Sequence, residues 1–146
     1  MKLLIIRHGD PDYSIDSLTE KGWREAEYLS ERIAALDVKA FYVSPLGRAK
    51  DTASLTLKKM GREAEELPWL REFNAPILRP DAPERRHVTW DWLPQDWTAE
   101  PRFYLPDQWH LHPVMQGADV KSVYDWVCGG LDALLARHGY RREGMI

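Results

Sequence analysis

The feature that most constrains this chain is an apolar run near its beginning, Leu3-Leu4-Ile5-Ile6, which stops at Arg7-His8-Gly9. The run shows no alternation of polar and apolar residues, a pattern typical of a strand buried on both faces of a parallel sheet. Parallel sheets bind ligands at the carboxyl ends of their strands, where Arg7 and His8 would lie. A guanidinium suits phosphate or carboxylate, and a neutral imidazole can act as a nucleophile. Taken alone, the tripeptide also fits a purely structural role.

A second motif follows a second short apolar run, Ala40–Val43, and reads Ser44-Pro45-Leu46-Gly47-Arg48-Ala49. Ser44 is a good N-cap and Pro45 a good first helical residue, so we expect Arg48 in the opening turn of a helix. The free amides and the helix dipole of that turn favour an anion. The two motifs together predict that two arginines converge on one histidine.

These motifs resemble those of the histidine phosphatase superfamily, also called the phosphoglycerate mutase-like family. Its members have Arg-His-Gly at the end of the first strand and Ser-Pro-Leu-x-Arg-Ala after the second, and both motifs match here at every defining position. The resemblance implies an α/β fold of three layers with a mainly parallel sheet. It implies that His8 accepts a phosphoryl group whose oxygens are held by Arg7 and Arg48. It also implies that Glu72 protonates the leaving oxygen.

Composition excludes several other classes. The chain of 146 residues has room for one domain, and its 44% hydrophobic and 29% charged residues are typical of a soluble globular protein. A net charge of -3 gives no broad basic field, which argues against nucleic acid or an anionic membrane as a partner. A single cysteine, Cys128, excludes an internal disulfide. Because the first apolar run is too short for a signal or membrane span, we expect a cytoplasmic protein.

The loop after the first predicted strand supplies candidates for substrate binding. Residues 10–16 are rich in turn formers and would lie over the end of the strand. Asp10, Tyr13 and Ser14 are the candidates there, and Gly9 would let backbone and ligand approach closely. The alternative is that these loop side chains are only solvated.

The remaining pattern predicts helices and one further strand. Ser17-Leu18-Thr19-Glu20 has the spacing of a capping box and predicts the start of an amphipathic helix. The helix opened by Ser44 should end near Gly61, and a third strand is expected over about 64–67. A right-handed crossover would make the first two strands parallel. A long helix is expected after Asp119 as its N-cap.

An irregular insertion is expected at about 74–117, within a single domain of residues 1–146. Seven of the ten prolines and four of the seven tryptophans fall between residues 74 and 113. Because so many aromatic side chains are costly to leave in water, we expect them to pack as a cap beside the mouth of the active site. His110 and His112 lack partners at metal-ligand spacing. Five basic residues could meet substrate or be no more than surface and packing residues: Arg85, Arg86, His87, His110 and His112.

The resembled family has a second histidine, usually followed by glycine, at the end of a strand after the long helix. Here the chain reaches Ile146 without such a strand. We expect a sheet that is incomplete at the C-terminus, as in a chain truncated from a longer protein. A possible homodimer, in which a partner copy covers the incomplete sheet, is an alternative. Arg137-His138-Gly139 repeats the opening tripeptide, but no apolar strand precedes it, so we interpret it as a coincidence.

The preferred function is a phosphomonoester hydrolase that acts through a phosphohistidine on a small phosphorylated substrate. Without the second histidine the chain should be impaired, since loss of one such donor costs about a hundred- to a thousandfold in rate. No metal or other cofactor is expected where arginines supply the positive charge. One alternative is a non-catalytic phosphate-binding or interaction module. Another is a phosphoglycerate mutase-type phosphotransferase, which needs a closed and strongly cationic pocket that the sequence does not reveal.

Overall fold

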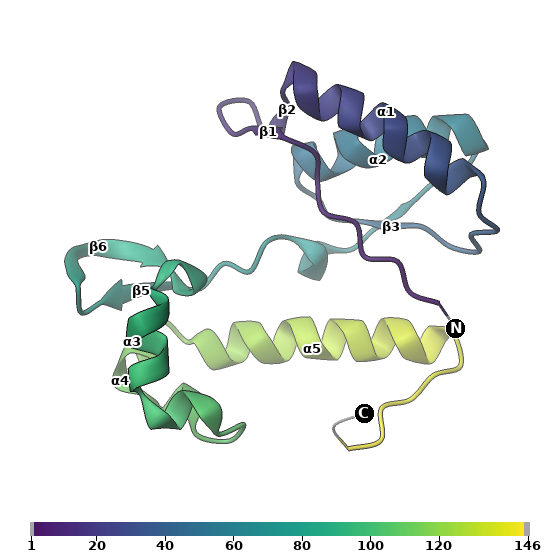
Figure 1. The fold of residues 1–146 in the computed structure, drawn as a ribbon. Helices are drawn as coiled ribbons and strands as arrows, with labels where there is room; N and C mark the ends of the chain where they lie inside the picture. The colour runs from purple at the N-terminus through teal and green to yellow at the C-terminus, as the bar shows by residue number, and fades with distance from the viewer. Residues whose placement is uncertain (1, 145–146) are drawn as a thin grey trace. The chain divides into compact units, whose positions relative to one another are not determined.

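The computed structural model describes residues 2–144. The chain divides into two compact units between Arg71 and Glu72. In the first unit two helices lie side by side (Figure 1). Its elements are, in chain order, β1 (Pro11–Asp12), β2 (Ser17–Leu18), α1 (Glu20–Ala34), β3 (Tyr42–Val43), α2 (Gly47–Met60), β4 (Glu65–Glu66) and a short 3-10 helix, η1 (Pro68–Leu70).

Helix α1 begins at Glu20, at the predicted capping box, and its N-cap lies two residues after Ser17, the first residue of that box. Thr19 is the N-cap, and its hydroxyl accepts a hydrogen bond from the Gly22 amide. The helix buries Ala26 and Ile33, which lie on the predicted apolar face.

Helix α2 starts two residues later than the second motif predicts. Ser44 is not the N-cap, because its hydroxyl accepts from the Leu46 amide in a turn that precedes the helix. Arg48 nevertheless falls in the first turn, as expected. Gly61 ends the helix with φ of 60°, the left-handed conformation that favours glycine.

The strand predicted over residues 3–6 is not formed. The side chains of this run are exposed, and that of Ile5 is 89% exposed. A strand requires a ladder partner, and the described residues supply none to this run, since β3 pairs with β4 instead. The predicted parallel pairing of the first two strands is therefore wrong for the described part of the chain.

The fold is α/β, but the described strands form three separate two-stranded sheets. Strands β3 and β4 are parallel, with Tyr42 opposite Glu65, and β4 lies where a third strand was predicted. Strands β1 and β2 are antiparallel and form a short hairpin before α1. A single, mainly parallel sheet with helices on both faces is not found within residues 2–144.

The second unit opens with an antiparallel hairpin that the proline-rich sequence did not predict. Ile77 pairs with His87 in this hairpin, and Ile77 is fully buried. The elements of the unit are β5 (Pro76–Arg79), β6 (Ala82–Val88), η2 (Thr89–Asp91), α3 (Pro94–Ala99), η3 (Pro101–Tyr104), η4 (Trp109–Leu111), α4 (Pro113–Gln116) and α5 (Val120–Arg137).

An apolar cluster holds the second unit together. Trp92 is buried and its ring centroid lies 5.4 Å from that of Trp97 and 5.8 Å from that of Phe103. Trp92 is thus packed among aromatic rings, whereas Trp90 and Tyr104 are exposed. The role of this segment as a cap beside the active site remains a prediction. The buried members of the cluster are Ala75, Ile77, Trp92, Met115 and Val120.

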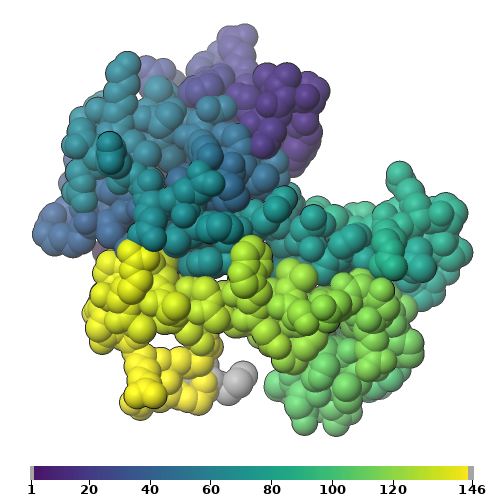
Figure 2. All heavy atoms as spheres, turned by 180° about the vertical axis from the view of Figure 1, so that it is seen from behind, coloured from purple at the N-terminus to yellow at the C-terminus, as the bar shows by residue number. Residues whose placement is uncertain are grey.

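Helix α5 follows Asp119, the predicted N-cap position, and buries Val120 and Leu134. Tyr124 and Trp126 of this helix are exposed. Figure 2 shows atoms of this part of the chain, in light green and yellow, on the surface. Among the residues that the structure describes, no helix combines the length and the apolar character needed to cross a membrane.

Candidate active site

The candidate site lies in the first unit, where the β1–β2 hairpin meets both helices. Gly9 precedes this hairpin and packs on α1, since a Cβ at Gly9 would lie 2.9 Å from the Gly22 carbonyl oxygen. The Asp10 amide donates to the Glu25 carboxylate at 2.8 Å, which ties the same segment to α1 a second time. Glycine and hydrogen bonds thus fix the backbone that carries His8.

The His8 imidazole has a defined tautomer. Its Nδ1 lies 2.8 Å from the Gly9 carbonyl oxygen, and a carbonyl oxygen can only accept. Nδ1 therefore carries the hydrogen, and in the neutral ring the lone pair is left on Nε2. A half-buried imidazole of this kind offers Nε2 as a nucleophile.

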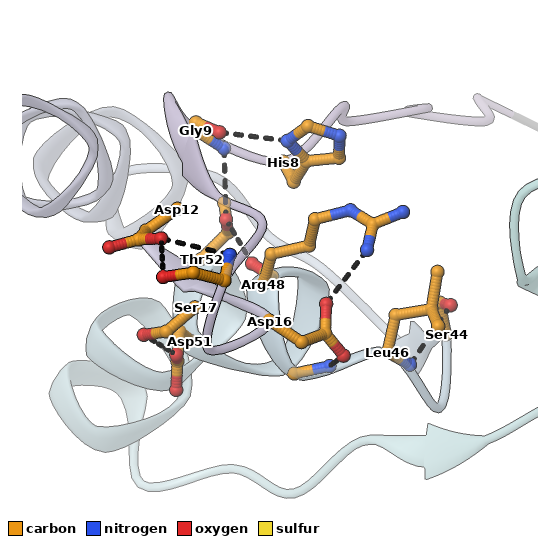
Figure 3. A network of polar contacts seen from close by, with 12 residues as sticks. His8, Gly9, Asp12, Asp16, Ser17, Ser44, Leu46, Arg48, Asp51 and Thr52 are labelled. Atoms are coloured by element: carbon orange, nitrogen blue, oxygen red, sulfur yellow. Dashed lines mark hydrogen bonds and ion pairs between the residues drawn. The ribbon is translucent and has the colours of Figure 1, made fainter. Parts of the chain in front are cut away.

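A short chain of hydrogen bonds joins the two sequence motifs. The Gly9 amide donates to the Thr52 hydroxyl at 3.0 Å, and this hydroxyl donates to the Arg48 carbonyl oxygen at 2.7 Å. Thr52 is buried at this junction. Figure 3 shows the His8 ring and the Arg48 side chain extending to the same side of the junction. The first turn of α2 and the Arg-His-Gly segment are therefore held in one polar network.

Arg48 is buried, with a side chain that is 10% exposed. Its Nη1 donates to Asp16 Oδ1 at 2.7 Å, and its Cζ lies 5.3 Å from the centroid of the Tyr13 ring. The second oxygen of Asp16 accepts from the Gly47 amide at 2.7 Å. This amide hydrogen bond, with the Arg48 contact, lowers the pKa of Asp16 below its ordinary value. Ionised Asp16 therefore pairs with the arginine that the motif predicted for anion binding.

Asp16 is a residue of the site that sequence reasoning missed. It was placed in the predicted loop only as a turn former, and its backbone does adopt the left-handed region with φ of 47°. One sequence signal did point to this contact. An aspartate in a turn can accept hydrogen bonds from the free amides at the start of a helix that follows later in the chain.

The three loop candidates have different surroundings. Tyr13 lies against Arg48, as described above. The Asp10 carboxylate accepts from the Thr19 hydroxyl at 2.7 Å, and the Ser14 amide and hydroxyl both donate to Asp12. These last contacts stabilise the hairpin itself and hold the pKa of Asp12 below its ordinary value. The substrate-binding roles of Gly9, Asp10, Tyr13 and Ser14 remain predictions.

The other two predicted catalytic residues are exposed. Arg7 precedes His8 in the exposed segment before the hairpin. Glu72 is an exposed residue at the beginning of the second unit. Their roles as phosphoryl ligand and proton donor therefore remain predictions.

Several basic residues of the insertion have structural partners. Arg86 donates to the carbonyl oxygens of Pro76 and Gly117. His112 Nδ1 accepts from the Val114 amide at the start of α4, and burial lowers the pKa of His112. These contacts favour packing roles for Arg86 and His112. No group of three or more histidine, cysteine, aspartate or glutamate side chains suited to a metal ion is found among the described residues.

Comparison with known proteins places the chain in a family. The model of the histidine phosphatase superfamily (branch 1) matches residues 3–143. The chain is similar to a probable phosphoglycerate mutase GpmB of Cronobacter sakazakii, at 29% identity over 92% of this chain and 63% of that protein. It is also similar to a 2,3-bisphosphoglycerate-dependent phosphoglycerate mutase of Thermoplasma acidophilum, at 34% identity over 41% of this chain and 35% of that protein. No solved structure gives a significant match.

The match covers both motifs and nearly the whole of the described chain, although the chain spans less than two-thirds of the length of these relatives. The matched range contains His8, whose Nδ1 faces the Gly9 carbonyl oxygen, and Arg48 in the first turn of α2. On this evidence the chain belongs to the histidine phosphatase superfamily.

Proposed function

We propose that the protein hydrolyses a small phosphomonoester through a phosphohistidine on Nε2 of His8. In the first step Nε2 attacks phosphorus, an N–P bond forms and the bond from phosphorus to the leaving oxygen breaks. In the second step water attacks the phosphohistidine, which returns the imidazole and releases inorganic phosphate. The lone pair for the first attack comes from the tautomer that the Gly9 carbonyl oxygen selects.

The observation that supports this proposal is that one hydrogen-bond network holds both the His8 imidazole, in the tautomer with its lone pair on Nε2, and the buried Arg48. His8 Nδ1 is held at 2.8 Å from the Gly9 carbonyl oxygen, and the Gly9 amide is linked through Thr52 to the backbone of Arg48. Phosphoryl transfer depends mainly on positioning and on positive charge around the transferred group. A histidine and an arginine fixed in one network support that chemistry.

Two further roles complete the proposed reaction. Arg7, together with Arg48, binds the oxygens of the phosphoryl group. Glu72 gives a proton to the leaving oxygen and then takes one from the attacking water. The chemistry needs both functions, because the leaving oxygen and the attacking water change protonation state.

A mutase-type phosphotransferase is the second candidate. It is favoured by the relatives, whose names are phosphoglycerate mutases. In that reaction the phosphohistidine passes its phosphoryl group to a second phosphorylated acceptor instead of water. Both candidates share the first step, so an experiment that traps the phosphohistidine tests their common part.

The test is to incubate the chain with p-nitrophenyl phosphate, quench it in base and measure both bound phosphoryl groups and released p-nitrophenol. The proposal predicts one alkali-stable, acid-labile phosphoryl group per chain, which is lost in His8→Asn. Discharge by water alone supports the hydrolase, and discharge only when 3-phosphoglycerate is added supports the mutase. Binding of phosphate without any label would support a non-catalytic binding module instead.

We also propose that the exposed Leu3–Ile6 run is a strand of a three-layer, mainly parallel sheet in the whole protein. Support comes from the exposure of four consecutive apolar residues and from the greater length of the relatives. A second copy of this chain could supply the pairing edge, and sedimentation over a range of concentrations tests that arrangement. A cytoplasmic location is proposed from the single cysteine.

A further inference from the structure

We propose that Asp16 is a positioning residue, which holds the Arg48 guanidinium in the orientation that receives a phosphoryl group. The inference rests on the proposed function, because that function gives Arg48 its ligand. Asp16 lies outside both sequence motifs. If it positions Arg48, removal of its negative charge should weaken phosphate binding.

The Asp16 carboxylate bridges two groups of α2, with one oxygen on each. Oδ1 accepts from Arg48 Nη1 and Oδ2 accepts from the Gly47 amide, both at 2.7 Å. The guanidinium is therefore tied, through one rigid carboxylate, to the backbone at the beginning of the helix. The same contact satisfies an amide of the first turn, where Leu46 provides no side-chain cap.

Tyr13 holds the guanidinium from a second direction. Its ring centroid lies 5.3 Å from Arg48 Cζ, a distance at which a cation is attracted to an aromatic face. Tyr13 and Asp16 belong to the same loop between β1 and β2, so one loop supplies both contacts. An arginine restrained in this way loses little side-chain entropy when it binds an anion.

The backbone is shaped for this contact. Asp16 has a φ of 47°, a conformation that aspartate and asparagine tolerate better than most residues. At Gly47 a Cβ would lie 2.1 Å from the Asp16 carbonyl oxygen, so the approach of loop and helix requires glycine. An incidental ion pair on a surface would need neither feature.

The experiment compares Asp16→Asn with a matched control, Asp51→Asn. Asparagine keeps the shape, the left-handed backbone and an oxygen for the Gly47 amide, and it removes the charge that orients Arg48. Asp51 lies in α2, the helix of Arg48, and its carboxylate accepts a hydrogen bond from the Ser17 hydroxyl at 2.5 Å. Both variants thus weaken a contact between the hairpin and α2, but only one of them alters Arg48.

Two measurements are made on the 146-residue chain: the affinity for inorganic phosphate and the Nε–Hε NMR signal of Arg48, assigned with Arg48→Lys. Positioning predicts that Asp16→Asn weakens phosphate binding by roughly ten- to a hundredfold and broadens or shifts the signal, whereas Asp51→Asn does neither. Simple electrostatics predicts the opposite sign, because removal of a negative charge near an anion site should tighten phosphate binding.

Tighter or unchanged phosphate binding in Asp16→Asn would overturn the proposal, as would an equal loss in Asp51→Asn. Failure of the proposed function has a different signature. In that case phosphate binding depends on Asp16 as described, but His8 of the wild-type chain never takes up a phosphoryl group from p-nitrophenyl phosphate.

Discussion

At the scale of single residues, the site depends on short polar contacts that the sequence specifies only in part. The motifs identified His8 and Arg48, because residue type and position relative to a helix start are visible in the sequence. The Gly9 carbonyl oxygen and Thr52 could not be predicted as partners, because one contact depends on backbone conformation and the other joins segments far apart in the chain. Asp16 was indicated only by its place in a turn, which does not reveal that Arg48 is its partner. The candidate site was thus predictable as a set of reactive groups, but not as a network.

Gly47→Ala tests how closely the hairpin and α2 approach. The new Cβ would lie 2.1 Å from the Asp16 carbonyl oxygen, so the loop must move away from the helix. We expect a loss of about 1–3 kcal/mol in the free energy of unfolding, together with weaker phosphate binding.

The matched control is Gly129→Ala, because a Cβ at this glycine of α5 meets no atom within 4 Å beyond its chain neighbours and the nearby backbone of its own helix. That change should stabilise the chain by about 0.5–1 kcal/mol, as alanine favours a helix interior. Chemical denaturation of both variants measures the two effects. Equal, small effects would show that the hairpin does not approach Gly47 closely.

At the scale of elements, the sequence predicted best where a periodic apolar face was accompanied by an end signal. Helix α1 has its capping threonine, α2 has Gly61 at its end and α5 begins directly after Asp119. The β5–β6 hairpin was not predicted, because the prolines in and beside its strands are typical of irregular structure. Pro80-Asp81 is nevertheless a common turn pair. Arg79 then fixes this turn by donating to Asp81 and to the Asp91 carbonyl oxygen, a set of contacts that no periodicity reveals.

Glu100→Gln tests an acid-sensitive contact at the start of η3. The amide and guanidinium of Arg102 both donate to Glu100, and these hydrogen bonds lower the pKa of Glu100 from 4.5 to about 2. A carboxyl group with a lowered pKa in the folded state stabilises that state above its unfolded pKa. This stabilisation is lost as the pH falls from about 4.5 towards 2.

We therefore expect wild type to be more stable than Glu100→Gln at pH 7, and we expect the difference to shrink as the pH falls through this range. Urea denaturation of both chains between pH 7 and pH 2 measures it. A difference that stays constant across the acid range would contradict the assignment.

At the scale of the whole molecule, the apolar run Leu3–Ile6 marks the limit of pattern-based prediction. Its composition favours a buried strand, but burial requires neighbours, and the described residues provide no strand that pairs with it. The α/β class and the superfamily were predictable because they depend on local motifs. Sheet order was not, because it depends on which distant segments are present to pair.

Two alanine variants of the same residue type test where the core lies. Ile5 is 89% exposed, whereas Ile77 is fully buried in the second unit. In dilute solution Ile5→Ala should change the free energy of unfolding by less than about 0.5 kcal/mol. Ile77→Ala should cost about 2–5 kcal/mol, since it removes buried methyl groups and leaves a cavity. A large loss in Ile5→Ala would show that the first apolar run is buried in the isolated chain.

The most direct test of the proposed chemistry is to locate the phosphoryl group after reaction with p-nitrophenyl phosphate. The chain offers an internal control, because Arg137-His138-Gly139 repeats the sequence around His8. Peptide mapping identifies the labelled histidine, and phosphorus NMR of the labelled chain with ¹⁵N-labelled histidine identifies the nitrogen. The expected result is a single phosphoryl group on Nε2 of His8, because Nδ1 donates to the Gly9 carbonyl oxygen. A label on Nδ1, a label on His138, or no label at all would contradict it.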